Sequence, residues 1–192
     1  MRKENIMRSS IFILMVASVF FMACGSGSDQ AATAEVTAPQ KTSGGSDAEF
    51  TWYTDWDKGI EAAIKEQKPA LVDFYADWCG YCKKMDKETF AASEIKSRLA
   101  DGWIGIKING EDKNKRATIE GKSVNYRELM QHFGIKGFPT MLIIDKEGNA
   151  VEPYTTDINY VPPKPFGPIL DYFREELYNQ DININDYIKS KI

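Results

Sequence analysis

Cysteine and histidine, which hold structural zinc ions and iron–sulfur clusters, are scarce in this sequence. The 192-residue chain has three cysteines and one histidine, His132. A structural zinc ion or an iron–sulfur cluster takes about four ligands. Cys79 and Cys82 form one pair, but no second cysteine pair accompanies them, so we expect no metal site. His132 does not lie between the cysteines, and we expect it on the surface or packed on a helix.

The sequence also lacks an excess of positive charge. It contains 24 lysines and arginines against 28 aspartates and glutamates, which gives a net charge of -4. A nucleic-acid-binding protein needs a basic surface that attracts phosphates. Here the cations are mixed with carboxylates, as on a solvated surface. We therefore expect no nucleic-acid partner.

An apolar run at residues 11–22 is too short to cross a membrane comfortably. Basic residues precede it and small residues follow it, which is the layout of an export signal. The sequence Ala23-Cys24-Gly25-Ser26 resembles the bacterial lipoprotein type, which implies that Cys24 is acylated and becomes the new N-terminus. An ordinary cleaved signal and an uncleaved anchor are the alternatives. In each case we expect the rest of the chain to be exported.

Composition divides the chain into four parts. Residues 1–24 are the signal with its anchor cysteine. Residues 25–48, rich in Gly, Ser, Thr, Ala and Gln, are expected to form a flexible linker, because they cannot bury enough surface to offset chain entropy. Residues 49–180 have the length and hydrophobic content of one domain. Residues 181–192 are a tail or a short helix.

Hydrophobic periodicity within residues 49–180 predicts alternating helices and strands. A helix begins near Trp56 and ends before Pro69, and the apolar run Ala70–Tyr75 is typical of a strand buried on both faces. Pro162 to Pro165 are expected to stop regular structure before the last helix. The order is βαβαββα with an N-terminal addition, and a polar insert lies at 111–126. The remaining predicted elements are helices at 83–89, 93–99, 128–133 and 167–178, strands at 103–108 and 141–144, and an edge strand at 150–154.

Cys79 and Cys82 have the Cys-x-x-Cys spacing of a redox pair. A plain structural disulfide is the alternative, but closing so short a loop gains little stability. The pair lies where the predicted strand meets the next helix. Unpaired N–H groups and the helix dipole stabilise a thiolate at Cys79 there. We therefore favour thiol–disulfide chemistry, in which the pair itself carries two electrons and no soluble cofactor is needed.

Two motifs carry a resemblance to a known family. They are Lys68-Pro-Ala-Leu-Val-Asp-Phe-Tyr-Ala-Asp-Trp-Cys-Gly-Tyr-Cys-Lys-Lys-Met85 and Gly137-Phe-Pro-Thr140. Together they resemble the thioredoxin superfamily, and within it the exported domains similar to the C-terminal domain of the thiol:disulfide interchange protein DsbD. The resemblance runs from about Trp52 to Tyr178. It implies a thioredoxin-like α/β fold, with a central mixed β-sheet flanked by helices.

The resemblance also implies roles for the matching residues. Cys79 is expected to be the attacking nucleophile and Cys82 the resolving thiol. Pro139 matches the cis-proline of the family, which places the backbone of Phe138 beside the sulfurs, where a substrate chain can pair. The rim of the substrate site is then completed by Trp78, Gly80 and Tyr81.

Asp73 interrupts an otherwise apolar strand and matches the buried acid of the family. A polar residue of an alternating strand that faces solvent is the alternative, and the apolar neighbours of Asp73 favour burial. Desolvation raises the pKa of a buried carboxyl, which suits Asp73 to exchange a proton with Cys82. Lys107 falls where the family often keeps a lysine near that acid, so an Asp73–Lys107 pair is expected. A lysine on the surface is the alternative for Lys107.

The function implied is that of an exported protein-disulfide reductase, anchored by lipid to a bacterial membrane and facing the periplasm or extracytoplasmic space. Its expected partners are protein thiols and disulfides, with a membrane electron donor similar to DsbD-type proteins. Gly80-Tyr81 also occurs in periplasmic disulfide isomerases, so an oxidase or isomerase is one alternative. A redox-inert binding lipoprotein is an alternative of another class, and the intact cysteine pair argues against it.

Overall fold

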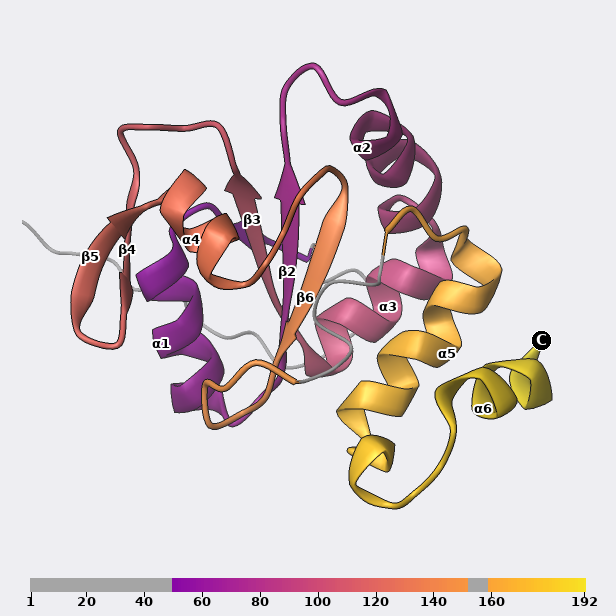
Figure 1. The fold of residues 1–192 in the computed structure, drawn as a ribbon. Coiled ribbons are helices and arrows are strands. Elements are labelled where there is room, and N and C mark those ends of the chain that lie inside the picture. Colours follow the sequence, from indigo (N-terminus) through magenta and orange to yellow (C-terminus); the bar gives the residue numbers. More distant parts are fainter. Residues whose placement is uncertain (1–49, 152–158) are drawn as a thin grey trace, which may run out of the picture. The chain divides into compact units, whose positions relative to one another are not determined.

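A computed structural model describes residues 50–151 and 159–192. At its centre is a mixed sheet of strand order β1-β3-β2-β6 (Figure 1). β1 (Trp52–Tyr53) and β2 (Ala70–Tyr75) run parallel to β3 (Ile104–Asn109), whereas β6 (Thr140–Ile144) is antiparallel to β2. The predicted α/β architecture with a mixed sheet is therefore confirmed.

Helices cover both faces of this sheet, because side chains alternate along its strands. Val72 and Phe74 of β2 join the core under α1 (Trp56–Glu66) and α4 (Tyr126–His132). Leu71 joins the core under α3 (Ser93–Gly102) and α5 (Pro163–Arg174). Figure 1 shows α1 and α4 on one side of the strands and α3 and α5 on the other. β2 is thus buried on both faces, as its apolar sequence predicts.

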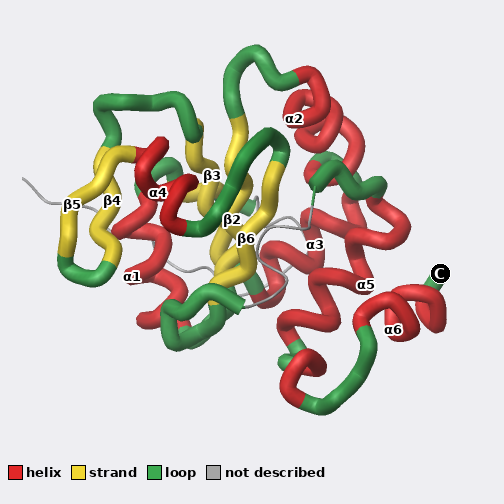
Figure 2. The backbone as a smooth tube through the Cα atoms, in the orientation of Figure 1, coloured by secondary structure: helices red, strands yellow, loops and turns green. Residues whose placement is uncertain are grey.

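A short loop links β2 to the helix that carries the cysteines, as Figure 2 shows. α2 (Gly80–Lys84) starts at the cysteine pair and continues into a π-helical segment, Met85–Phe90. Met85 and Phe90 enter the core that α3 and α5 cover. This packing fixes the helix, and with it the cysteines, at one end of the sheet. The prediction that a helix begins at the cysteines is confirmed.

The polar insert at 111–126 contains structure that the sequence analysis did not predict. It folds into a hairpin of β4 (Arg116–Ile119) and β5 (Lys122–Asn125). The two turn residues, Glu120 and Gly121, have φ values of 50° and 75°, the left-handed conformation that two-residue hairpin turns require. The predicted helix near 128–133 begins earlier, at Tyr126, because Asn125 and Glu128 form a capping box.

Both predicted ends of the last helix of the domain need correction. The last helix of the predicted domain begins at Pro163 rather than near Gly167. Proline is tolerated in the first turn of a helix, because the N–H group that it lacks would have no acceptor within the helix there. The helix ends at Arg174, and a 3-10 turn, Leu177–Asn179, follows. Of the predicted edge strand, Ala150 makes an isolated bridge to Ile144. Residues 152–158 lie outside the described part of the chain.

The C-terminal residues form a short helix, α6 (Ile184–Lys191), which was one of the two expected alternatives. It packs on α5 through Tyr187 and Tyr172, whose ring centroids are 5.7 Å apart. Within residues 50–151 and 159–192, no helix has both the length and the apolar character needed to cross a membrane.

Candidate active site

Cys79 and Cys82 are joined by a disulfide across the first turn of α2, with their Cα atoms 5.3 Å apart. Cys79 is the N-cap of the helix, and its Sγ accepts a hydrogen bond of 3.0 Å from the backbone N–H of Cys82. Such an N–H group also stabilises negative charge on sulfur once the disulfide is opened. The geometry therefore favours Cys79 as the thiolate of the pair.

The loop before β6 lies against the disulfide. Phe138 packs on the cluster that Ala76 and the two cysteines form. The Phe138–Pro139 peptide bond is cis, which confirms the expectation for Pro139. The hydroxyl of Thr140 donates to the carbonyl oxygen of Gly137 at 2.8 Å and closes this loop. The two motifs of the sequence, far apart along the chain, thus meet at one place.

Asp73 is 1% exposed, so its predicted burial in β2 is confirmed. Its Oδ1 has no hydrogen-bond partner among the described residues. Burial raises the pKa of Asp73 from 3.8 to about 7, while the positive charge of Lys107 opposes this rise and the negative charge of Asp86 adds to it. An acid with such a pKa can release and regain a proton near neutral pH.

Lys107 faces Asp73, and the predicted pair is confirmed with its Nζ 3.7 Å from Asp73 Oδ2. The closer partner of this ammonium is Asp86, on the π-helical segment one turn beyond Cys82. Lys107 is therefore shared between a buried and an exposed carboxylate. Its Nζ also lies within 5.8 Å of three ring centroids, those of Trp52, Tyr75 and Phe90.

The rim of the site consists of aromatic side chains. Trp78 is 69% exposed, and its indole N–H donates to Glu111 Oε2 at 2.8 Å. Its ring centroid lies 6.0 Å from that of Phe138. Tyr81 is 64% exposed, and its ring lies beside Tyr160, with centroids 5.9 Å apart. Gly80, between them, is exposed and a side chain there would meet open space.

Sequence reasoning missed three residues of this site, namely Asp86, Glu111 and Tyr160. Asp86 could have been suspected, since it follows Cys82 by one helical turn and so lies on the same helix face. Glu111 and Tyr160 belong to the polar insert and to the segment before α5, whose sequences carry no signal for this site.

His132, at the end of α4, is exposed and packs on Phe133, with ring centroids 4.8 Å apart. Cys24 lies outside the described residues.

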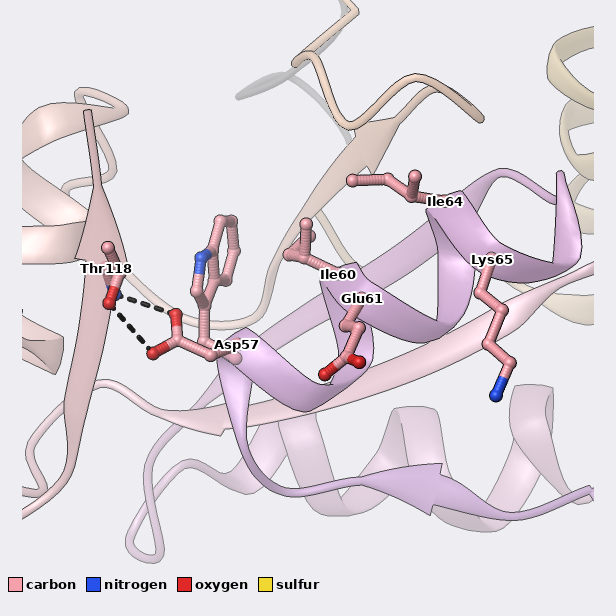
Figure 3. A pocket seen from close by; sticks show the side chains of 7 residues that line it. Asp57, Ile60, Glu61, Ile64, Lys65 and Thr118 are labelled. Atoms are coloured by element: carbon pink, nitrogen blue, oxygen red, sulfur yellow. Dashed lines mark hydrogen bonds between the residues drawn. The ribbon is translucent and has the colours of Figure 1, made fainter. Parts of the chain in front are cut away.

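A separate hollow of about 630 Å³ lies between α1 and β4 (Figure 3). Trp56, Ile60 and Ile64 line it with apolar surface. At its edge, the carboxylate of Asp57 accepts hydrogen bonds from the backbone N–H and the hydroxyl of Thr118, at 2.7 and 3.0 Å. No residue of the cysteine turn lines this hollow, so we assign it no part in the thiol chemistry.

Comparison with known proteins agrees with this arrangement. The model of the thioredoxin-like domain family matches residues 56–174. The thiol:disulfide interchange protein DsbD of Colwellia psychrerythraea is 32% identical over 93 residues, which make up 48% of this chain and 14% of that protein. The chain thus spans about one seventh of the length of this curated relative.

Two solved structures share the fold. A thioredoxin-fold protein from Helicobacter pylori superposes with a TM-score of 0.53 at 20% identity, over 66% of this chain and 85% of that one. A thioredoxin from Thermus thermophilus superposes with a TM-score of 0.51 at 19% identity, over 66% of this chain and 88% of that one. At these identities the likeness concerns the fold alone.

Proposed function

Because this chain belongs to the thioredoxin-like domain family, we propose that it is a thiol–disulfide oxidoreductase that reduces protein disulfides outside the cytoplasm. The observation that carries the proposal is the disulfide between Cys79 and Cys82 at the start of α2, packed against the Phe138–Pro139 loop. The partial likeness to DsbD supports the choice of chemistry.

The reaction begins with the reduced form of the pair. The thiolate of Cys79 attacks one sulfur of a disulfide in a substrate protein, here called the client. The client S–S bond breaks, and a mixed disulfide forms between Cys79 and the client. The released client thiolate takes up a proton from water. Cys82 then gives up its proton and attacks Cys79 Sγ. The mixed disulfide breaks, the Cys79–Cys82 disulfide closes, and the second client sulfur leaves as a thiolate that takes up a proton. Two electrons have passed to the client, and a dithiol donor must return the pair to its reduced form.

Asp73 is the proposed acceptor of the Cys82 proton. It is buried on β2, and its pKa of about 7 lets it hold a proton in one step and release it in another. Lys107, which links Asp73 to the segment after Cys82, tunes this carboxyl by charge. The substrate-facing surface consists of Trp78, Gly80, Tyr81 and the Phe138–Pro139 loop.

We further propose that the chain is exported and held at a membrane by acylated Cys24, with residues 25–48 as the linker. Its electron donor is then a membrane protein similar to DsbD. These proposals rest on the sequence of residues 1–48 and on the partial likeness to DsbD.

A trapping experiment tests the activity. In Cys82→Ser the mixed disulfide on Cys79 cannot be resolved, so the variant should accumulate covalent adducts with a protein disulfide such as insulin. Cys79→Ser, which lacks the nucleophile, is the matched control and should form none. The unaltered protein, kept reduced with dithiothreitol, should accelerate insulin reduction. The absence of both acceleration and adducts would favour a redox-inert binding protein.

A disulfide isomerase is the second candidate, because Gly80 and Tyr81 stand between the cysteines. Refolding of a scrambled disulfide protein separates the two. An isomerase restores the native pairing in a redox buffer, whereas a reductase leaves the substrate's thiols reduced.

A further inference from the structure

The two most exposed large apolar side chains among the described residues stand on either side of Cys79 along the chain. They are Trp78, 69% exposed, and Tyr81, 64% exposed. Exposed aromatic rings at a protein surface often mark an interface, because they bury much apolar area at little cost in side-chain entropy. Trp78 directly precedes Cys79 and Tyr81 directly precedes Cys82, so both rings lie at the rim of the disulfide.

Both rings are held in place rather than left free. Trp78 is fixed by its hydrogen bond to Glu111, 2.8 Å long, and by its edge contact with Phe138. Tyr81 is backed by the ring of Tyr160, 5.9 Å away. A surface that is already ordered loses less entropy when a partner binds.

Tyr160 is itself anchored to the cysteine-bearing helix. Its hydroxyl donates to Glu88 Oε2 at 2.8 Å, and Lys84 Nζ lies 4.6 Å from its ring centroid. The neighbouring Val161 carbonyl accepts a hydrogen bond of 2.7 Å from Thr89 Oγ1. The segment before α5 is therefore bound to the helix at three points, two of which involve the Tyr160 side chain.

Two charged residues next to Tyr160 form an ion pair with each other. Lys84 Nζ is 3.8 Å from Glu88 Oε2, so the wall that Tyr81 and Tyr160 form presents rings next to a neutralised ion pair. Such a wall offers an apolar side chain a contact surface.

We propose that Tyr160 is a specificity-determining residue that holds Tyr81 as an aromatic wall, so that the site prefers polypeptide disulfides with an aromatic side chain next to the cysteine. This rests on the proposed reductase function. It adds to that function a substrate class and a residue that is distant in sequence from the cysteine pair.

Two peptides, each closed by one disulfide and differing only in Phe or Gly next to a cysteine, test the proposal. The second-order rate constants of their reduction are measured by stopped flow with the reduced full-length protein. We expect the protein to prefer the Phe peptide by about tenfold. In Tyr160→Ala this ratio should fall to about twofold, whereas Tyr160→Phe, which keeps the ring, should retain most of it. Tyr53→Ala removes an exposed tyrosine on β1 and is the matched control.

Tyr81→Ala, a change at an exposed position, repeats the test if Tyr160→Ala folds poorly, and the same loss of preference is expected. Equal rates for both peptides with the unaltered protein overturn the inference. So does an unchanged ratio in both alanine variants, or an equal loss of both rates. All three results leave the reductase function standing. Failure of the unaltered protein to reduce either peptide is a different result, because it contradicts the proposed function itself.

Discussion

Asp73 and Lys107 are register partners on the parallel strands β2 and β3, and Lys107 Nζ lies 3.7 Å from Asp73 Oδ2. The ion pair does not keep the pKa of Asp73 in its ordinary range. Burial raises this pKa to about 7, because its effect is larger than the opposing effect of the Lys107 charge. Lys107 is also shared with the exposed carboxylate of Asp86. The result is a buried acid that changes its protonation near neutral pH.

Asp73→Asn should slow resolution of mixed disulfides by about tenfold or more at pH 7, because an amide cannot accept the Cys82 proton. The fold should survive, since the amide has nearly the shape of the carboxyl. Stopped-flow reduction of a model disulfide, followed across pH, measures the effect. Glu61→Gln, at an exposed position on α1, is the control. An identical pH profile in Asp73→Asn would remove Asp73 from the proton path.

The same substitution should stabilise the oxidised protein at high pH. The native carboxyl keeps its proton up to about pH 7, whereas the unfolded one ionises near its ordinary pKa of 3.8. The free energy of unfolding therefore falls by up to about 4 kcal/mol as pH rises through this interval. Asparagine does not ionise, so this decrease is absent in the variant. Urea unfolding should show a larger gain for Asp73→Asn at pH 8 than at pH 4.5. A gain that is equal at both values would contradict the raised pKa.

Asp86→Asn should lower the pKa of Asp73. The substitution removes a negative charge that raises this pKa, and it leaves Lys107 free to pair with Asp73 alone. Lys107→Met should act in the opposite direction. A carbon-13 NMR titration of the Asp73 carboxyl reads both shifts directly. If the two variants move the midpoint the same way, charge is not what tunes this acid.

The cysteine pair should be comparatively reducing. Strong oxidants stabilise the attacking thiolate through the residues between the cysteines, and Gly80 and Tyr81 carry no cation. We expect a potential closer to the value of about -270 mV for thioredoxin than to the value of about -120 mV for DsbA. Equilibration with glutathione buffers, followed by thiol alkylation and mass analysis, gives the potential. Tyr81→His should make the pair more oxidising. A potential near the DsbA value would favour an oxidase.

The mature chain should begin at an acylated Cys24. Intact-mass analysis of protein from bacterial membranes should show the mass of residues 24–192 plus lipid. Cys24→Ser should lose the lipid mass and leave the membrane fraction. A mature chain that starts elsewhere without lipid refutes the anchor, while the cysteine chemistry is unaffected.

Much of the fold could be predicted because its signals are local. The apolar run of β2 indicates a strand buried on both faces, and Asp73 within it indicates a buried acid. The cysteine spacing and the strand-to-helix junction indicate a thiolate at a helix start. Where the local signal was equivocal, as at the prolines in the first turn of α5, the predicted boundary was wrong.

The cysteine pair, the strand before it and the acid within that strand could thus be predicted without a structure, because the signal for each lies in neighbouring residues. The side chains that surround them come from distant parts of the chain and could not be predicted in this way. Lys107 reaches Asp86 across 21 residues of sequence, and Trp78 reaches Glu111 across 33. Tyr160 contacts Tyr81, although the two residues are distant in sequence. Such contacts depend on how whole elements pack on the sheet, and no local periodicity or propensity encodes that packing.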